Sequence, residues 1–561
     1  MTSKIGLIIT KFNSDTPIKT NNSDTRTRIF PFSKFLKMTL PYLIDDCVYN
    51  ILQYLQNDGS TLFNCLLVNR FWCKTTIPIL YANPFATGYR KKHKLISTII
   101  LLFNKEEILQ LKNQLGTNQI KKFNIDDEHK PLFEYLKYLE DYNYYKISSF
   151  MTRFIFCNIT LSISSSLKEC KFNISPIFHQ RILCQSRNIK QLDISLDLFN
   201  SEAFKNFNVQ NFISNLTKLK SLTLSLSLGD TNNNEIEQEF LGSIANNNFN
   251  NLNLRKLIID LTSKKLVGQK INTCEKIYKI IQGQNKLKIF QIRNCCYSLL
   301  NNILLSLEFR KHSLVHIEIV KSDFINVNLK SFNNLYNLEY LIFESCEGIL
   351  LSQCEILKFA SFKLKELSFI RNEWNADVTS LMIKYLGESL QKLLIEDPTI
   401  QLIENISMYC PNLIFLEIRI YLYVDLSVLS FLKNLRIRIL NIKISYNIDK
   451  IFFINLANNI PINISKISFS IYFCDFRLSK LKEFLENCHN SFEIINLNHI
   501  IEYQLLEIVL NYIERSNNSL KLLGMMKLNE KLNDKELKLL NQIEAKGVKI
   551  VEFNSIAMFS I

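Results

Sequence analysis

The feature that most constrains this chain is a short apolar pattern that recurs thirteen times in order. The unit is apolar-x-x-apolar-x-apolar, as in Leu219-x-x-Leu222-x-Leu224. Consecutive copies lie 23 to 35 residues apart, with a mean spacing near 28. One match to so loose a pattern arises by chance in a chain rich in Ile and Leu, but thirteen in order do not. The central residues of the copies are Leu192, Leu222, Leu257, Phe290, Ile317, Leu341, Leu367, Leu393, Leu416, Leu440, Ile467, Ile495 and Leu523.

The alternating end of each copy predicts a short strand, because side chains alternate between the two faces of a strand. The stretch between copies often has helical spacing, as in residues 478–485. One strand and one helix cannot bury their own apolar faces, whereas stacked units share a continuous core. We therefore expect an α/β solenoid with a curved parallel sheet on the concave side and helices on the convex side.

Glycine is scarce, with 12 in 561 residues, and no two lie closer than the 13 positions between Gly229 and Gly242. A loop that cradles phosphate needs closely spaced glycines so that backbone amides can approach the ligand. Neither GxGxxG nor GxxxxGK[ST] occurs, which argues against the common nucleotide-binding enzymes. No Ser/His/Asp or Cys/His set indicates catalysis, so we expect a non-catalytic chain without a cofactor.

Fourteen cysteines occur without any CxxC pair, so zinc-ligand spacing is absent. We expect reduced, mostly buried thiols and hence a cytoplasmic or nuclear protein. His312 and His316 are four apart, a metal-binding spacing on a helix. Because His316 falls on an expected strand, no metal site is predicted. No signal peptide and no membrane span are expected either.

The net charge is +15. Such a charge permits binding to nucleic acid, acidic proteins or anionic membranes. The simpler interpretation is that lysines are spread over a solvated surface.

The N-terminal part differs from the repeats. Residues 1–38 are polar and basic, and we expect a disordered tail. Residues 39–85 have helical apolar spacing, with Ser60 as a candidate cap for the second helix and Pro78 as the end of the third. Residues 86–150 are expected to be a helical connection, and residues 151–561 the solenoid, with about 13 to 15 repeats.

The segment 39–85 resembles the F-box family. Its members open with Leu-Pro, continue with an Ile-Leu helix and reach a Leu-Val-x-Arg-x-Trp segment. The matching residues here are Leu40-Pro41, Val48, Ile51-Leu52, Leu55, Leu62, Cys65-Leu66-Leu67-Val68-Asn69-Arg70, Trp72 and Leu80-Tyr81. The first helix is slightly displaced from Leu40-Pro41 compared with many members.

The thirteen copies resemble the cysteine-containing leucine-rich repeats that are often fused to F-boxes. The copy at residues 410–418, Cys-Pro-Asn-Leu-Ile-Phe-Leu-Glu-Ile, is most similar to that subtype. The two resemblances together imply a substrate-recognition adaptor of a Skp–cullin–F-box (SCF) ubiquitin ligase. The F-box would bind a Skp-family adaptor and, through it, a cullin, while the repeats would hold a protein substrate.

Two sets of candidate residues follow. The first would bind the adaptor, because so small a helical unit leaves apolar surface for a partner. It comprises Leu40, Pro41, Val48, Ile51, Leu52, Val68 and Trp72. The second set flanks the inward anchors of the middle strands and would face a protein substrate. It contains both carboxylates and apolar side chains, a mixture that suits a protein segment. It comprises Tyr340, Ile342, Glu344, Glu366, Ile370, Leu394, Glu396, Phe415, Glu417 and Arg419.

Two other functions stay open at this point. A leucine-rich-repeat scaffold without a ligase role would have the same solenoid but would not bind a Skp-family adaptor. An RNA-binding solenoid would follow from the net charge, although carboxylates on the strands would repel phosphates. No membrane partner is expected.

Overall fold

The computed structural model describes residues 45–56, 58–86, 93–115, 133–158, 164–227, 234–246, 252–261, 271–421, 425–445, 448–471, 478–528 and 532–555. The chain forms two compact units, residues 1–56 and 57–561. In the first unit the described part is helix α2 (Asp45–Tyr54). The expected tail at 1–38, and Leu40 and Pro41, lie outside the described residues.

The second unit is built on one sheet of fifteen parallel strands, which follow one another in sequence order from β1 to β15. The strands are β1 (Asp141–Asn143), β2 (Gln191–Ser195), β3 (Ser221–Leu226), β4 (Lys256–Leu261), β5 (Ile289–Arg293), β6 (His316–Val320), β7 (Tyr340–Glu344), β8 (Glu366–Ile370), β9 (Lys392–Glu396), β10 (Phe415–Ile420), β11 (Ile439–Ile444), β12 (Lys466–Ile471), β13 (Ile494–Ile500), β14 (Leu522–Met526) and β15 (Lys549–Glu552).

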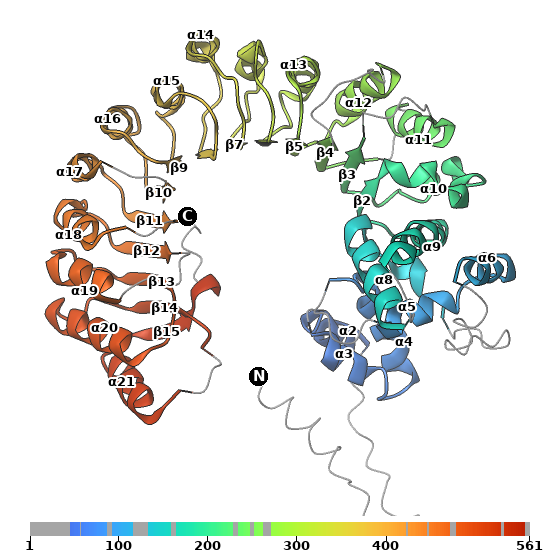
Figure 1. Ribbon diagram of the computed structural model, residues 1–561, viewed down its shortest axis with the longest axis horizontal. Coiled ribbons are helices and arrows are strands. Elements are labelled where there is room, and N and C mark those ends of the chain that lie inside the picture. Colours follow the sequence, from blue (N-terminus) through green and yellow to red (C-terminus); the bar gives the residue numbers. More distant parts are fainter. Residues whose placement is uncertain are drawn as a thin grey trace, which may run out of the picture. The chain divides into compact units, whose positions relative to one another are not determined.

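In the part of the chain that the structure describes, the α-helices connect the strands and cover one face of the sheet; we call the opposite face the helix-free face (Figure 1). The α-helices of this unit are α3 (Gly59–Cys65), α4 (Arg70–Ala82), α5 (His93–Ile100), α6 (Lys105–Leu115), α8 (Tyr144–Asn158), α9 (Ser164–Gln185), α10 (Val209–Ser214), α11 (Glu235–Ala245), α12 (Ile271–Gly283), α13 (Tyr297–Leu307), α14 (Leu351–Cys354), α15 (Ala376–Leu386), α16 (Ile400–Tyr409), α17 (Leu429–Leu432), α18 (Lys450–Asn459), α19 (Leu478–Asn487), α20 (Tyr503–Arg515) and α21 (Asp534–Ala545).

Short 3₁₀ helices replace or extend the α-helices in several repeats. They are η4 (Tyr135–Tyr138), η5 (Leu196–Asn200), η6 (Glu202–Phe204), η7 (Glu308–Arg310), η8 (Leu329–Asn334), η9 (Glu355–Phe359), η10 (Leu426–Val428) and η11 (Phe553–Ser555). In the repeat between β6 and β7, η8 is the whole helical element.

The thirteen central anchors read from the sequence occupy one row of the sheet. Each is paired in register with the anchor of the next repeat, from Leu192 with Leu222 to Ile495 with Leu523. All thirteen are at most 1% exposed and belong to one continuous apolar core. The expected α/β leucine-rich-repeat solenoid is therefore confirmed.

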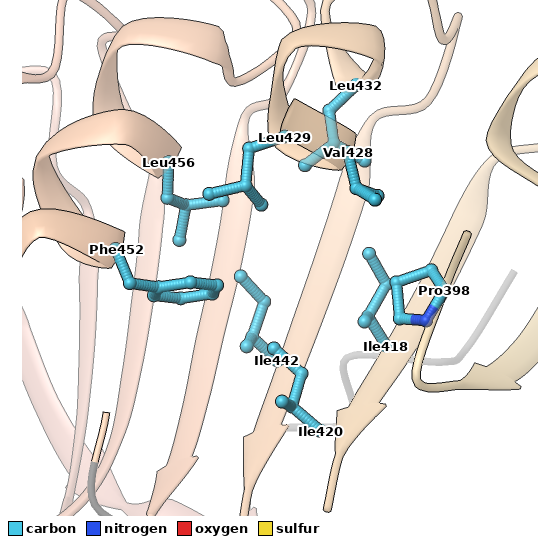
Figure 2. A pocket seen from close by; sticks show the side chains of 9 residues that line it. All are labelled: Pro398, Ile418, Ile420, Val428, Leu429, Leu432, Ile442, Phe452 and Leu456. Atoms are coloured by element: carbon cyan, nitrogen blue, oxygen red, sulfur yellow. The ribbon is translucent and has the colours of Figure 1, made fainter. Parts of the chain in front are cut away.

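One place in this core is loosely filled. A small apolar cavity lies between β10 and β11 on one side and α17 and α18 on the other (Figure 2). Helix α17 has a single turn, so the helical layer is thin here. The cavity is lined by Pro398, Ile418, Ile420, Val428, Leu429, Leu432, Ile442, Phe452 and Leu456.

Two local expectations for the N-terminal helices were wrong. Helix α3 begins at Gly59 and is capped by Asp58, whose carboxylate accepts from the Thr61 amide at 3.1 Å, so Ser60 is not the cap. Helix α4 continues through Pro78 to Ala82. A proline removes one helical hydrogen bond, to the carbonyl four residues earlier. That residue, Lys74, is exposed, so water can satisfy its carbonyl.

Candidate functional site

The residues expected to bind an adaptor differ widely in exposure. In α2, Val48 and Leu52 are buried, at 1% and 0% exposure, and Ile51 is partly buried. Val68 is 59% exposed. Trp72 is partly buried at the start of α4, where its amide donates to the capping side chain of Asn69 at 2.9 Å.

Around Val68 lies an apolar surface whose other residues are not among the predicted adaptor-binding residues. We call it the α3–α4 apolar surface, and it comprises Phe63, Leu67, Val68 and Phe71, which are 58%, 77%, 59% and 36% exposed. The inward positions of α3 are Leu62 and Cys65. Phe63 lies off that inward face, which is the signal that could have identified it. Large apolar side chains exposed together within nine residues are typical of an interaction surface.

The ten residues expected to face a substrate lie on β7, β8, β9 and β10, in the odd positions of each strand. Neighbouring strands bring them together in register: Tyr340 pairs with Glu366, and Glu344 with Ile370. The next two strands align Glu417 with Leu394, and Arg419 with Glu396. These positions alternate with the buried anchors and therefore belong to the helix-free face.

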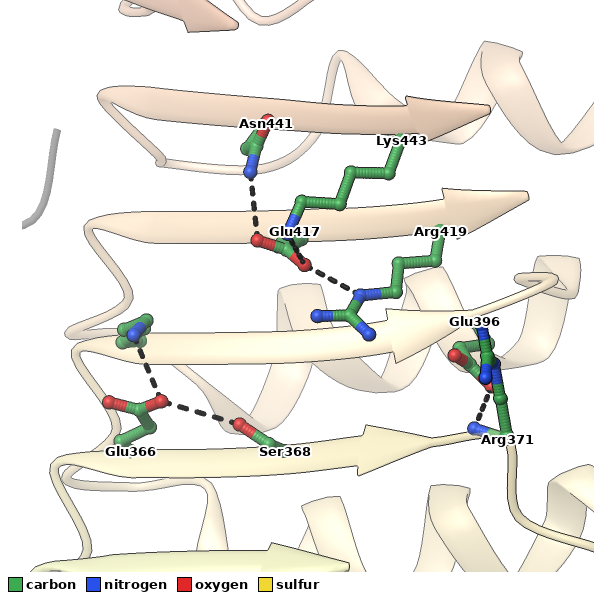
Figure 3. A network of polar contacts seen from close by, with 9 residues as sticks. Glu366, Ser368, Arg371, Glu396, Glu417, Arg419, Asn441 and Lys443 are labelled. Atoms are coloured by element: carbon green, nitrogen blue, oxygen red, sulfur yellow. Dashed lines mark hydrogen bonds and ion pairs between the residues drawn. The ribbon is translucent and has the colours of Figure 1, made fainter. Parts of the chain in front are cut away.

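On β10 and β11 this face contains an ion-pair network around the buried carboxylate of Glu417 (Figure 3). The Glu417 carboxylate is 2.7 Å from Arg419 Nε and 2.9 Å from Lys443 Nζ, and it accepts from Asn441 Nδ2 at 2.8 Å. Burial raises the pKa of Glu417, but the charges and hydrogen bonds of Lys443 and Arg419 outweigh burial, and the net pKa lies below its usual value. Glu417 is thus a charged structural group, and both of its carboxylate oxygens have partners within the chain.

The carboxylates of β8 and β9 are held differently. Glu366 forms an ion pair with Lys392 at 2.9 Å and accepts from Ser368 at 3.4 Å (Figure 3). Glu396 accepts a hydrogen bond from the backbone amide of Arg371. Burial raises the pKa of Glu396, and the amide of Arg371 opposes this only in part.

An apolar cluster lies beside these charged groups. Leu394, Phe415 and Ile439 pack together on the helix-free face, and the Lys392 ammonium lies 5.8 Å from the centre of the Phe415 ring. Phe415, Glu417 and Leu394 are only 1%, 3% and 6% exposed. Three of the ten predicted substrate residues therefore offer almost no surface, while the other seven are partly buried.

The same face continues on β5 to β7. The rings of His316 and Tyr340 stack with centres 5.7 Å apart, and Gln291 donates to Glu318 at 2.8 Å. Burial lowers the pKa of His316 and raises the pKa of Glu318. The partly buried rings and the Glu318 carboxylate can bind a polar and apolar peptide surface, whereas Gln291 is only 5% exposed.

Metal-binding groups do not assemble in the described ranges. Nowhere in them do three His, Cys, Asp or Glu side chains gather closely enough to hold a metal ion. His312 lies beside Tyr336 and His316 lies beside Tyr340, so each imidazole contacts its own tyrosine of the next repeat. The described cysteines are free thiols, most of them buried or partly buried, with Cys47 and Cys184 exposed. None of the helices described is both long and apolar enough to cross a bilayer.

Comparison with known proteins adds little to this picture. No protein-family model matches the chain, and no curated protein matches its sequence. An internalin from Listeria monocytogenes is similar in structure, with 15% identity, a TM-score of 0.27, and coverage of 67% of this chain and 88% of that one. The yeast Rad7–Elc1 complex is similar with 15% identity, a TM-score of 0.34, and coverage of 84% of this chain and 99% of that one. Both TM-scores are low, so the fold assignment depends on this chain's own strand order and register.

Proposed function

We propose that this chain is a non-catalytic, protein-binding leucine-rich-repeat scaffold that acts as the substrate-recognition subunit of an SCF ubiquitin ligase. Its F-box-like segment would bind a Skp-family adaptor, and the helix-free face would bind a protein substrate. The chemistry would belong to other subunits, and this chain would contribute proximity and orientation.

The observation that carries the proposal is the α3–α4 apolar surface. It falls within the segment that resembles an F-box, and its four side chains are exposed although the same segment also supplies buried residues such as Leu62 and Cys65. Exposed Leu, Val and Phe side chains cost free energy in water unless a partner covers them. A Skp-family adaptor is the partner that the sequence resemblance implies.

The substrate part of the proposal is supported by the mixed character of the helix-free face. The stacked His316–Tyr340 pair, partly buried Ile342 and Ile370, and the carboxylates of Glu318 and Glu344 lie on neighbouring strands. Interfaces between proteins combine aromatic anchors with charged groups in this way.

The test is binding of a purified Skp-family adaptor to the full chain and to the variant Leu67→Glu/Val68→Glu. Both side chains are exposed, so the variant should fold, and two carboxylates on an apolar interface should weaken adaptor binding by about 2 kcal/mol or more. Calorimetry measures the affinity. Leu40→Ala/Pro41→Ala should weaken it as well.

The matched control is Leu305→Glu/Phe309→Glu, which changes two residues of similar exposure, 48% and 62%, far along the chain. It should bind the adaptor as the unchanged chain does. If the unchanged chain fails to bind any Skp-family adaptor, the ligase role is wrong and a scaffold without a ligase remains.

A further inference from the structure

A row of basic residues lies immediately before strands β2 to β5. Lys190, Lys220, Arg255 and Lys288 each precede the first residue of their strand, and we call them the basic ridge. Their backbones are bonded directly: the amide of Lys220 donates to the carbonyl of Lys190 at 2.8 Å, Arg255 to Lys220 at 2.8 Å, and Lys288 to Arg255 at 2.9 Å. Adjacent strands lie about 4.8 Å apart, so the four basic residues follow one another across the sheet at this backbone spacing.

The same row continues through the other repeats, where its lysines have carboxylate neighbours, whereas Arg438, which lies between Ile414 and Ser465 in the row, has none among the described residues. Lys365 lies 2.8 Å from Glu339, and Lys521 lies 2.8 Å from Glu493. At the end of the ridge, Lys190 lies 2.7 Å from Glu140. Within the described residues, Lys220, Arg255 and Lys288 have no carboxylate within the 4.0 Å of an ion pair. The three are also exposed.

Further cations reinforce the ridge. Lys218 and Lys286 are exposed two residues before Lys220 and Lys288. The Lys218 ammonium donates to Asn188 Oδ1 at 2.6 Å and not to a carboxylate. Like charges directly opposite one another in a sheet repel and are destabilising. No carboxylate of the described residues relieves this repulsion at Lys220, Arg255 and Lys288. An anionic partner would relieve it.

The surroundings favour an acidic protein segment over single-stranded nucleic acid. Proteins that bind single strands without sequence preference combine cations with aromatic rings on which bases stack. In the described residues from 186 to 296, no Phe, Tyr or Trp is among the exposed large side chains. An acidic segment needs only the charges, since long Lys and Arg side chains can reach successive carboxylates.

We propose that the basic ridge is a binding surface for an acidic, Asp- and Glu-rich segment of a partner protein. This surface is separate from the α3–α4 apolar surface and from the β6–β10 part of the helix-free face. The inference goes beyond the ligase role and holds whether or not the chain binds a Skp-family adaptor.

The test measures binding of a fluorescein-labelled poly-glutamate peptide to the full chain by anisotropy. The variant Lys220→Glu/Arg255→Glu/Lys288→Glu reverses the ridge. The control variant Lys330→Glu/Lys433→Glu/Lys538→Glu makes the same change in net charge at exposed lysines elsewhere. Circular dichroism and thermal unfolding check that both variants fold. Labelled poly-glutamine and single-stranded poly-uridylate RNA are the competing probes.

The unchanged chain should bind poly-glutamate but not poly-glutamine, with affinity that falls as salt rises. The ridge variant should lose about tenfold or more in affinity, and the control variant should stay within about twofold. Both variants should keep the adaptor affinity of the unchanged chain, which separates this test from that of the ligase role. The proposal is overturned if poly-glutamate does not bind, if the two variants lose affinity equally, or if RNA binds more tightly and depends on the ridge.

Discussion

Glu417 illustrates how single residues of the helix-free face acquire their roles. Its strand reads Phe-Leu-Glu-Ile-Arg-Ile, a pattern that predicts Glu417 and Arg419 on the same face but not their burial. Lys443 approaches from the neighbouring strand, where it pairs in register with Arg419. The carboxylate is therefore neutralised by one cation from its own strand and one from the next repeat. Only the stacking of repeats could produce the second contact.

Glu417→Gln should destabilise the chain by about 2–3 kcal/mol at neutral pH. The substitution leaves Arg419 and Lys443, whose side chains are 19% and 25% exposed, without their shared anion. Urea unfolding measures the loss of stability, and native-state hydrogen exchange shows whether it is largest at β10 and β11. Glu344→Gln is the control, since Glu344 has no ion pair within the described residues and its change should cost little.

The pH dependence of this variant provides a second readout. The folded pKa of Glu417 lies below its unfolded value of about 4.5, so its stabilisation is present above that pH and is lost as the pH falls through the folded pKa. The unchanged chain should therefore lose its advantage over Glu417→Gln in acid. A stability difference that stays constant down to pH 2 would contradict this assignment.

At the scale of elements, the residue after each of strands β5 to β9 adopts a left-handed backbone conformation. These residues are Asn294, Lys321, Ser345, Arg371 and Asp397, with φ between 35° and 57°. The amides of Asn294, Lys321 and Asp397 donate to carbonyls of the next repeat at 2.9, 2.7 and 2.9 Å. Asn and Asp tolerate this conformation well, whereas Lys and Arg do not favour it, so the contact between repeats imposes it.

Two glycines give a matched test of how closely elements approach. A Cβ at Gly387, the residue after α15, would lie 2.5 Å from the Ile383 carbonyl oxygen and 2.7 Å from the Tyr409 carbonyl oxygen. Both are backbone atoms, which can move only at a large cost in free energy. Gly387→Ala should therefore lower stability by about 1–3 kcal/mol, which thermal unfolding measures.

Gly242 in α11 is the opposite case. A Cβ there would meet only the flexible end of the Lys276 side chain, at 3.8 Å. Because Ala is a better helix former, Gly242→Ala should raise stability by about 0.5–1 kcal/mol. Equal effects of the two substitutions would contradict the close approach of Gly387 to the Tyr409 carbonyl at the end of α16.

At the scale of the whole molecule, each repeat contacts chiefly its neighbours, so stability is a sum of local terms and the chain can open from one end. The end at β1 contains a buried polar group. The Tyr142 hydroxyl lies 2.7 Å from His179 Nδ1, and Ser148 Oγ lies 2.9 Å from His179 Nε2. Burial lowers the pKa of His179 to about 3.

Acid should therefore open this end of the sheet first. The folded pKa of His179 lies below its unfolded value of about 6.5, so its contribution to stability falls by about 1.4 kcal/mol per pH unit as the pH drops from 6.5 toward 3. Burial raises the pKa of Asp193 in β2 to about 6, and this smaller shift opposes the loss without cancelling it. Hydrogen exchange at pH 4.5 should show residues 133–227 losing protection before β7 to β10. His179→Gln, which cannot titrate, should reduce this pH dependence; an unchanged dependence would exclude His179 as its source.

The sequence by itself determined strands β2 to β14, their order and their register, but not β1, which lies in the expected helical connection 86–150. The two-residue alternation of each strand is local, and the same anchors recur in every repeat, so the row from Leu192 to Leu523 could be predicted without coordinates. The helices of the segment that resembles an F-box could be predicted from its apolar spacing too. The exposure of Leu67 and the continuation of α4 through Pro78 were not, because both depend on surroundings that no local pattern describes.

The tertiary structure alone decided how exposed each aligned side chain is and which side-chain contacts neighbouring repeats make. The spacing between anchors varies from 23 to 35 residues, and the helices absorb that variation, so distance along the chain does not predict adjacency across the sheet. The stacking of the repeats buries Phe415 and Glu417 on a face that was expected to be open. It also aligned Lys220, Arg255 and Lys288 into one ridge, where the sequence had indicated only scattered lysines. Burial and charge clustering are properties of the stacked rows, whereas periodicity is a property of the chain.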